Sequence, residues 1–90
     1  MPIANLNILK TIKKAARERR VLRIIYVEKN GTREGWRRVE PYSFSKDEFK
    51  KALFAWDIGK AGMRRFIIAR ISQAEIADSS YAPRYQIEVC

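Results

Sequence analysis

The feature that most constrains the fold is a series of short alternating segments separated by turn residues. The first segment ends at Asn30-Gly31, a pair that tolerates the positive φ of a two-residue hairpin turn. The expected strands cover residues 21–29, 32–41, 52–58, 63–72 and 84–89, with a short run at 74–77 and turns at 59–62 and 78–80. Short strands at this spacing predict a mainly β domain, either a small barrel or a strongly curled sheet of about five to six strands.

The two-residue turn also predicts the register of the first hairpin. Counting back from the turn places Ile25 opposite Trp36 and Tyr26 opposite Gly35. Arg37 then lies on the same side as Tyr26, and Gly35 leaves space above the tyrosine ring. We expect this strand to end, or to form a sheet edge, at its proline.

An amphipathic helix is predicted over residues 5–20, before the first strand. Its stripe consists of Ile8, Ile12, Ala15 and Arg19, which follow the i, i+4, i+7 spacing. The remaining faces carry Lys10, Lys13, Lys14, Arg17 and Arg20. We expect this helix to pack on the sheet, so that residues 1–90 form one domain with a helix at about 5–20 and a barrel at about 21–89.

The charge of the chain favours an anionic partner. Lysine and arginine number 19 against 10 acidic residues, a net charge of +9. Such an imbalance favours nucleic acid or a nucleotide, although a solvated basic surface is the alternative. One cysteine, Cys90, fits a reducing cytoplasm, and no apolar run is long enough to cross a bilayer.

The residues that most catalytic sites need are missing. The chain has no histidine and one cysteine, which leaves neither the commonest general base nor a thiolate metal site. It has no glycine-rich phosphate loop of the Walker or dinucleotide type. The sequence therefore favours binding over catalysis, with no metal and no cofactor.

Arginines occur on strands where apolar residues are more usual. If residues 63–72 form one strand, Arg64, Phe66, Ile68 and Arg70 share a face, and the two guanidinium groups lie about 20 Å apart at ~3.3 Å per residue. A guanidinium that is half-buried without an acidic partner is costly. Either carboxylates of the chain or an anionic ligand must therefore meet these arginines.

The aromatic residues of the strands have two possible roles. Trp36 and Trp56 are expected in the core, although an exposed tryptophan could stack on a base. Tyr26 is either a barrel aromatic with a solvated hydroxyl or a ligand contact.

An ordered set of motifs resembles the WYL domain family. The set comprises Leu22-x-Ile24-x-Tyr26, Gly31, Arg37-Arg38-Val39-Glu40-Pro41, Leu53-x-Ala55-x-Asp57 and Arg64-x-Phe66-x-x-x-Arg70-Ile71. The tripeptide that names the family falls on Lys51-Ala52-Leu53, where only the leucine is kept. The acid that often precedes the last arginine of the family is Ala69 in this chain.

The resemblance implies an Sm-like or SH3-like β-barrel preceded by a helix, used for ligand sensing in bacterial and phage transcription regulators. It implies a nucleic acid or another anionic ligand, bound at Tyr26, Arg37, Arg64 and Arg70. Secondary contacts to nucleic acid are expected from Arg38, Arg65, Lys13 and Arg17. This interpretation requires the guanidinium groups of the site to converge on one patch without internal acids.

The alternative is a protein-interaction module. Residues 84–89 as an edge strand could pair with a partner protein or with a second copy, which would make a homo-oligomer.

Overall fold

The fold is one helix followed by a single antiparallel sheet. The computed structural model describes residues 3–45 and 52–88. Its elements are α1 (Ile3–Arg17), β1 (Arg20–Val27), β2 (Arg33–Phe44), β3 (Ala52–Asp57), β4 (Gly62–Ile67), the 3-10 helix η1 (Ile68–Arg70) and β5 (Ile71–Ser80). The strand order is β4-β3-β2-β1-β5, and all neighbouring strands are antiparallel. The predicted mainly β domain with an N-terminal helix is confirmed.

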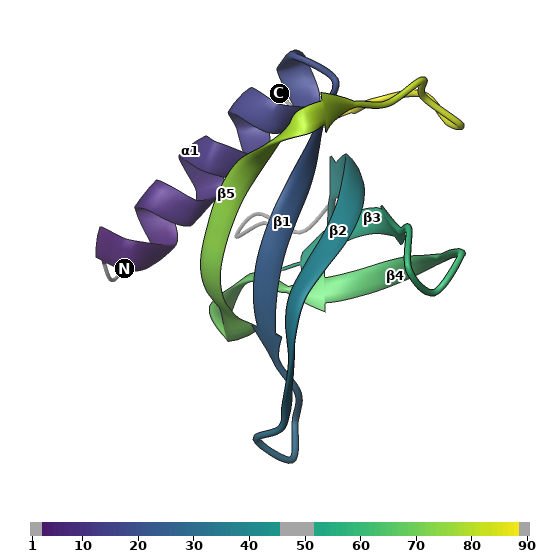
Figure 1. Cartoon of the computed structure of the whole chain (residues 1–90). Coiled ribbons are helices and arrows are strands. Elements are labelled where there is room, and N and C mark those ends of the chain that lie inside the picture. The colour runs from purple at the N-terminus through teal and green to yellow at the C-terminus, as the bar shows by residue number, and fades with distance from the viewer. Residues whose placement is uncertain (1–2, 46–51, 89–90) are drawn as a thin grey trace.

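The sheet is strongly curled, but its edge strands do not pair. Figure 1 shows β4 crossing at a steep angle to β1 and β5, with α1 packed along one side of the sheet. Strands β4 and β5 are the two ends of the strand order, and η1 connects them. Because no ladder joins β4 to β5 within the described residues, the predicted closed barrel of Sm-like or SH3-like type is not confirmed.

Helix α1 packs its apolar stripe onto the sheet. Ile8, Ile12 and Ala15 are buried, as their spacing predicts. Arg17 lies in the last turn, where a cation interacts favourably with the helix dipole. The helix ends at this residue and not at residue 20, because Arg19 has a φ of 52°, the left-handed conformation that closes helices. Arg19 is exposed and does not belong to the buried stripe.

The loop between β1 and β2 is longer than predicted. The N–H of Glu28 donates to the carbonyl of Thr32 at 2.9 Å, so Lys29, Asn30 and Gly31 all lie in the loop. Gly31 has a φ of 89°, as expected for the residue that follows a type I turn in such hairpins. The predicted two-residue turn is therefore wrong, although the glycine is where the chain needs positive φ.

A bulge in β2 restores the predicted register. Val27 pairs with Arg33, but Ile25 pairs with Trp36, so β2 contains one more residue than β1 over this interval. Gly35 lies in the interval with a φ of 79°, which is typical of the left-handed residue of a bulge. The bulge cancels the extra residue of the loop, and the predicted pairing of Ile25 with Trp36 is confirmed.

Strand β2 continues through its proline. Pro41 pairs with Ala55, the next pair is Ser43 with Phe54, and a register shift lies between them. A proline is tolerated at a bulge because its missing N–H falls outside the regular ladder. The predicted end of the strand at Pro41 is therefore wrong.

The predicted strand over residues 63–72 is broken by a corner. The last β3–β4 pair is Ala52 with Ile67, and Ala52 is the first residue of β3. After Ile67 the chain turns through η1 and then pairs with β1, beginning with Ile71 opposite Tyr26. The run at 74–77 and the expected turn at 78–80 both lie within β5.

Two hydrophobic clusters lie on opposite faces of the sheet. We call the face packed against α1 the inner face and the opposite one the outer face. The larger cluster includes Ile8, Ile12, Leu22, Ile24, Tyr26, Val39, Leu53, Ala55 and Phe66. The smaller one consists of Val21, Tyr42 and Tyr81, with Trp56 packed against it. Val21 and Leu22 belong to different clusters because successive strand residues point to opposite faces.

The C-terminal segment packs on the outer face. Arg84 Nε donates to Glu40 Oε1 at 3.1 Å, and its guanidinium stacks on Trp56 at 4.6 Å from the ring centroid. Tyr85 contacts Tyr42 edge-on at a centroid distance of 5.4 Å. The strand predicted over residues 84–89 is wrong for its described part, residues 84–88, because this segment uses its side chains to cover the sheet. Residue 89 lies outside the described residues.

Candidate functional site

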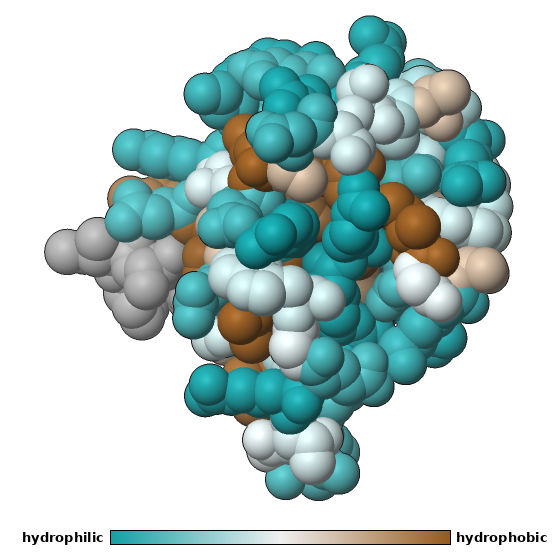
Figure 2. Space-filling view, in the orientation of Figure 1, coloured by the Kyte–Doolittle hydropathy of each residue, from teal (hydrophilic) through white to brown (hydrophobic). Residues whose placement is uncertain are grey.

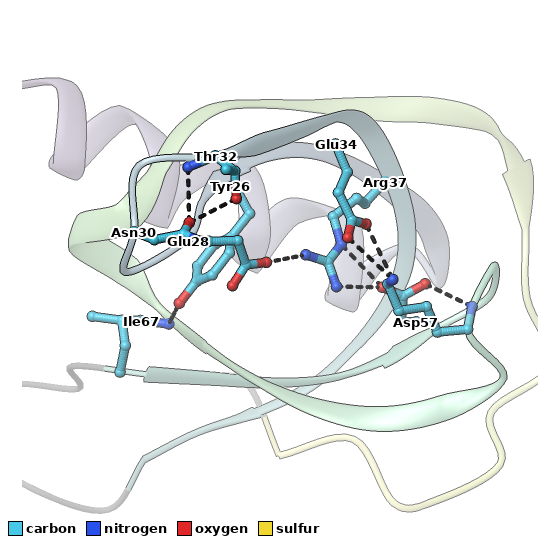
Figure 3. A network of polar contacts seen from close by, with 9 residues as sticks. Tyr26, Glu28, Asn30, Thr32, Glu34, Arg37, Asp57 and Ile67 are labelled. Atoms are coloured by element: carbon cyan, nitrogen blue, oxygen red, sulfur yellow. Dashed lines mark hydrogen bonds and ion pairs between the residues drawn. The ribbon is translucent and has the colours of Figure 1, made fainter.

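A buried arginine lies on the inner face between two acidic residues of different exposure. Arg37 donates from Nε and Nη2 to Asp57 Oδ2 at 3.1 and 2.9 Å, and from Nη1 to Glu28 Oε2 at 3.0 Å (Figure 3). The side chains of Arg37 and Asp57 are 9% and 3% exposed, whereas that of Glu28 is 40% exposed. Asp57 Oδ1 also accepts the backbone N–H of Lys60 at 3.1 Å. One acid is therefore held firmly inside the sheet, and the other lies at the surface.

Two aromatic rings pack against this guanidinium. Its Cζ lies 5.0 Å from the ring centroid of Phe66 and 5.9 Å from that of Tyr26. The two rings contact each other edge-to-face at 5.1 Å. The Tyr26 hydroxyl accepts the backbone N–H of Ile67 at 2.9 Å, which holds the ring at the start of the corner. The rings and the carboxylates together orient Arg37.

The charge of Arg37 is stabilised inside the protein. Burial opposes the charged form, but the hydrogen bond and the charge of Asp57, followed by the hydrogen bond of Glu28, outweigh it and raise the pKa of Arg37 above its ordinary value. The expectation of an arginine without internal acids is therefore wrong for Arg37, because carboxylates of the chain meet it.

Three of the four predicted site residues lie on the inner face of the sheet. Tyr26 and Arg37 lie together on the inner face. Arg64 pairs with Ala55 as Phe66 pairs with Leu53, so it belongs to the same face. Arg64 is exposed, and within the described residues it has no acidic partner.

Arg70 does not share a strand with Arg64. It is the last residue of η1, it is half-buried, and it precedes Ile71, which pairs with Tyr26. The predicted single face from Arg64 to Arg70 is wrong, because the extended backbone ends at Ile67. Arg70 therefore lies at the corner of the sheet, next in the chain to the residue that pairs with Tyr26.

The predicted secondary contacts lie elsewhere. Arg38 and Arg65 alternate with Arg37 and Arg64, so they belong to the outer face, and Arg38 Nη2 donates to Ser79 Oγ at 2.9 Å. Lys13 and Arg17 lie on α1. That any of the predicted residues binds a ligand stays a prediction.

Sequence patterns did not predict the two acids around Arg37. Asp57 alternates with the buried Leu53 and Ala55, and a carboxylate on an apolar face needs a cationic partner. This alternation is the signal that could have found it. Glu28 gives no such signal, because it lies at the end of a hairpin next to many cations.

A cleft opens where β2 and β3 separate. Their last pair is Val39 with Asp57, followed by a hydrogen bond from the N–H of Ile58 to the carbonyl of Arg38 at 2.9 Å. Beyond this point β3 turns toward β4, while β2 continues beside β1. The cleft has a volume of about 490 Å³ and is lined by Glu34, Trp36, Arg37, Arg38, Asp57, Ile58, Gly59 and Lys60. Residues of both faces of β2 therefore reach one cavity.

The surface in view carries no large hydrophobic patch among the described residues. On the side shown in Figure 2, hydrophobic residues form separate small areas among hydrophilic ones. Within residues 3–45 and 52–88, no helix has the length and apolar character needed to cross a bilayer. The same residues contain no group of three or more histidine, cysteine, aspartate or glutamate side chains placed to bind a metal ion.

Comparisons with known proteins agree with this architecture. The family model described as WYL domain matches residues 7–76. Among solved structures, proteasome accessory factor B/C (PafBC) of Arthrobacter aurescens is similar, with a TM-score of 0.75 and 21% sequence identity. The similarity covers 94% of the present chain and 14% of the PafBC chain. At this identity it shows a shared fold. None of the curated proteins is a significant match.

Proposed function

Because this chain belongs to the WYL domain family, we propose that it is a regulatory domain of a transcription regulator and that it senses an anionic ligand. The ligand is a nucleotide or a single-stranded nucleic acid, as the net charge of +9 favours. Tyr26, Arg37, Arg64 and Arg70 form the site. The domain binds without catalysis, and it acts in the cytoplasm of a bacterium or of a phage host.

The observation that carries this proposal is the unequal exposure of the two acids on Arg37. Asp57 is buried and is held by a second hydrogen bond, whereas Glu28 is 40% exposed at the end of a hairpin. An anionic oxygen from a ligand can replace Glu28 at Nη1 while Asp57 keeps the guanidinium oriented. The exchange leaves no buried charge unpaired, so it avoids the main cost of opening such a site.

Arg64 supplies the second cation. It lies on the same face as Arg37, on the edge strand β4, and it has no acidic partner within the described residues. An exposed arginine on the same face as a buried, oriented one suits a ligand with several phosphates. Phosphate accepts two parallel hydrogen bonds from a guanidinium, and these charge-assisted bonds are among the strongest in proteins.

A comparison of two neighbouring arginines tests the proposal. Arg64→Gln and Arg65→Gln remove the same charge from exposed residues of the same strand, but on opposite faces. Affinity for a labelled single-stranded oligonucleotide is measured by fluorescence anisotropy at several salt concentrations. Arg64→Gln should weaken binding more and lower the slope of log affinity against log salt by about 0.7, the value for one phosphate contact to a single strand. Equal effects would show a diffuse basic surface and overturn the site.

The interaction module remains the alternative. Its proposed strand at residues 84–88 is not a strand in the structure, so pairing of a partner or a second copy would have to use the edges β4 and β5. No contact in the described residues favours that function over ligand sensing.

A further inference from the structure

Trp36 lies on the surface instead of in the core. Its side chain is 40% exposed, although it pairs with Ile25 in the middle of the sheet. The guanidinium of Arg23 stacks on the indole, with Cζ 4.6 Å from the ring centroid. Trp36 also lines the cleft between β2 and the β3–β4 turn. A large flat ring is therefore held by one cation and remains open to solvent beside a cavity.

The charges around Trp36 are not balanced. Arg23 and Arg38 are direct partners across β1 and β2, and like charges in this arrangement destabilise a sheet. Arg23 is compensated by an ion pair with Glu75 on its other side. In the described part of the chain, Arg38 is met by the neutral hydroxyl of Ser79 at 2.9 Å and by no carboxylate.

The other cations of the cleft are already paired. Arg37 is bound to Asp57, and Lys60 Nζ lies 3.2 Å from a carboxylate oxygen of Glu34. Among the residues that line the cleft, Arg38 is thus the cation without an acidic partner in the described part of the chain. It is also 2 residues along β2 from Trp36, on the same face.

The β3–β4 side of the cleft contributes one aliphatic side chain beside polar residues. Ile58, which is 36% exposed, lines the cleft from the β3–β4 turn. The cleft volume of about 490 Å³ lies within the range of small-ligand sites. The cavity therefore offers an aromatic surface, one aliphatic side chain and a guanidinium that has no acidic partner in the described residues. A ligand that fits has a flat ring and a separate anionic group.

We propose that Trp36 and Arg38 form a second contact site for a nucleobase–phosphate unit, on the outer face of β2, in the cleft that Arg37 lines from the inner face. The base stacks on Trp36 and the phosphate binds Arg38. This inference rests on the proposed function, because the same nucleic acid or nucleotide occupies the domain. Consecutive residues of β2 serve the two faces at its free edge, so one strand of nucleic acid can reach both sites.

The test compares oligomers with and without bases. A labelled single-stranded 12-nucleotide oligomer is compared with an abasic oligomer of equal length, which has the same phosphates and no bases. The wild-type chain should prefer the oligomer with bases, and Trp36→Ala should weaken its binding by roughly tenfold, as expected for the loss of one stacked base. Trp36→Phe keeps a ring and should retain most of the preference. Arg38→Gln should weaken both oligomers.

Two outer-face residues that do not line the cleft are matched controls. Met63 is 39% exposed and Arg65 is exposed. Met63→Ala and Arg65→Gln should leave the preference for bases unchanged. If they remove it as Trp36→Ala does, the inference is overturned.

The fluorescence of Trp36 measures base stacking directly. In a Trp56→Phe chain, Trp36 is the remaining tryptophan, and the oligomer with bases should quench its fluorescence whereas the abasic oligomer should not. If free adenosine monophosphate also quenches this fluorescence, the nucleobase–phosphate unit that binds here can come from a free nucleotide.

The outcomes separate this inference from the proposed function. If the wild-type chain binds neither oligomer nor nucleotide, both fail. If it binds, but Trp36→Ala binds equally well and Trp36 fluorescence does not change, the second site is overturned while the proposed function stands.

Discussion

Arg37 donates two hydrogen bonds to a single carboxylate oxygen of Asp57, and both side chains are almost completely buried. The two residues are brought together by the β2–β3 register, in which Asp57 pairs with Val39. This ion pair lies at the point where the two strands separate. It therefore closes the hydrophobic core on one side and borders the cleft on the other.

We expect the Arg37–Asp57 pair to be strongly coupled. Arg37→Met leaves the Asp57 carboxylate buried and unpaired, and it should lower the free energy of unfolding by about 3–5 kcal/mol. The double variant Arg37→Met/Asp57→Leu should recover much of this loss, because hydrophobic residues often replace a buried pair without penalty. Urea unfolding measures each free energy. Losses that simply add, within about 0.5 kcal/mol, would contradict the coupling.

Glu28 should act as a removable competitor of the ligand. Glu28→Gln removes the exposed acid from Arg37 Nη1, and it should increase affinity for single-stranded oligonucleotides severalfold while changing stability by less than about 1 kcal/mol. Glu18→Gln is the matched control, since Glu18 is exposed at the end of α1 and its loss changes the net charge equally. Equal gains in the two variants, measured by fluorescence anisotropy, would mean that only net charge matters.

Gly35 should be required for its conformation and not for space. Its φ is 79°, and a Cβ at this position would meet nothing within 4 Å. Gly35→Ala should therefore destabilise the protein by about 1 kcal/mol through backbone strain alone. Gly59→Ala is the control, because Gly59 lacks a positive φ and a Cβ there meets only Asp57 Oδ1 at 3.6 Å. Chemical denaturation of both variants checks this, and an equal loss would show that the bulge is not strained.

Stability should decline at alkaline pH because of the outer-face tyrosines. Burial, together with the nearby charge of Glu40, raises the pKa of Tyr42 and of Tyr81 above the ordinary value of a phenol. Both groups are held neutral in the folded state, so their contribution is fully present below about pH 10, the unfolded pKa, and is lost as pH rises above it.

The measurement is urea unfolding between about pH 8 and pH 11. Tyr42→Phe should reduce the alkaline decline, and it should also lower stability at neutral pH, because the Tyr42 hydroxyl donates to Glu40 Oε1 at 2.9 Å and accepts the Arg84 N–H at 2.8 Å. Tyr85→Phe is the control, since Tyr85 is 52% exposed. An alkaline decline that is the same in Tyr42→Phe and in the wild type would contradict this assignment.

Local patterns in the sequence were enough for several features of this fold. The spacing of Ile8, Ile12 and Ala15 identifies the buried stripe of the helix, because 3.6-residue periodicity needs no information from distant residues. The predicted pairing of Ile25 with Trp36 is found as well, although only because the bulge at Gly35 cancels the extra residue of the hairpin loop. The side-by-side placement of Tyr26 and Arg37 follows from that pairing.

The tertiary structure alone decided which face of each strand is covered and which charges meet. The alternation of side chains along a strand assigns its residues to two faces, but it does not predict which face the helix or the C-terminal segment will cover. Trp36 therefore lies at the surface, although its strand position resembles that of a core residue. The chain turns at Ile68–Arg70, between a strand that pairs with β3 and a strand that pairs with β1. Glu28 and Asp57 meet Arg37 because three strands converge there, and such long-range contacts depend on the whole sheet being folded.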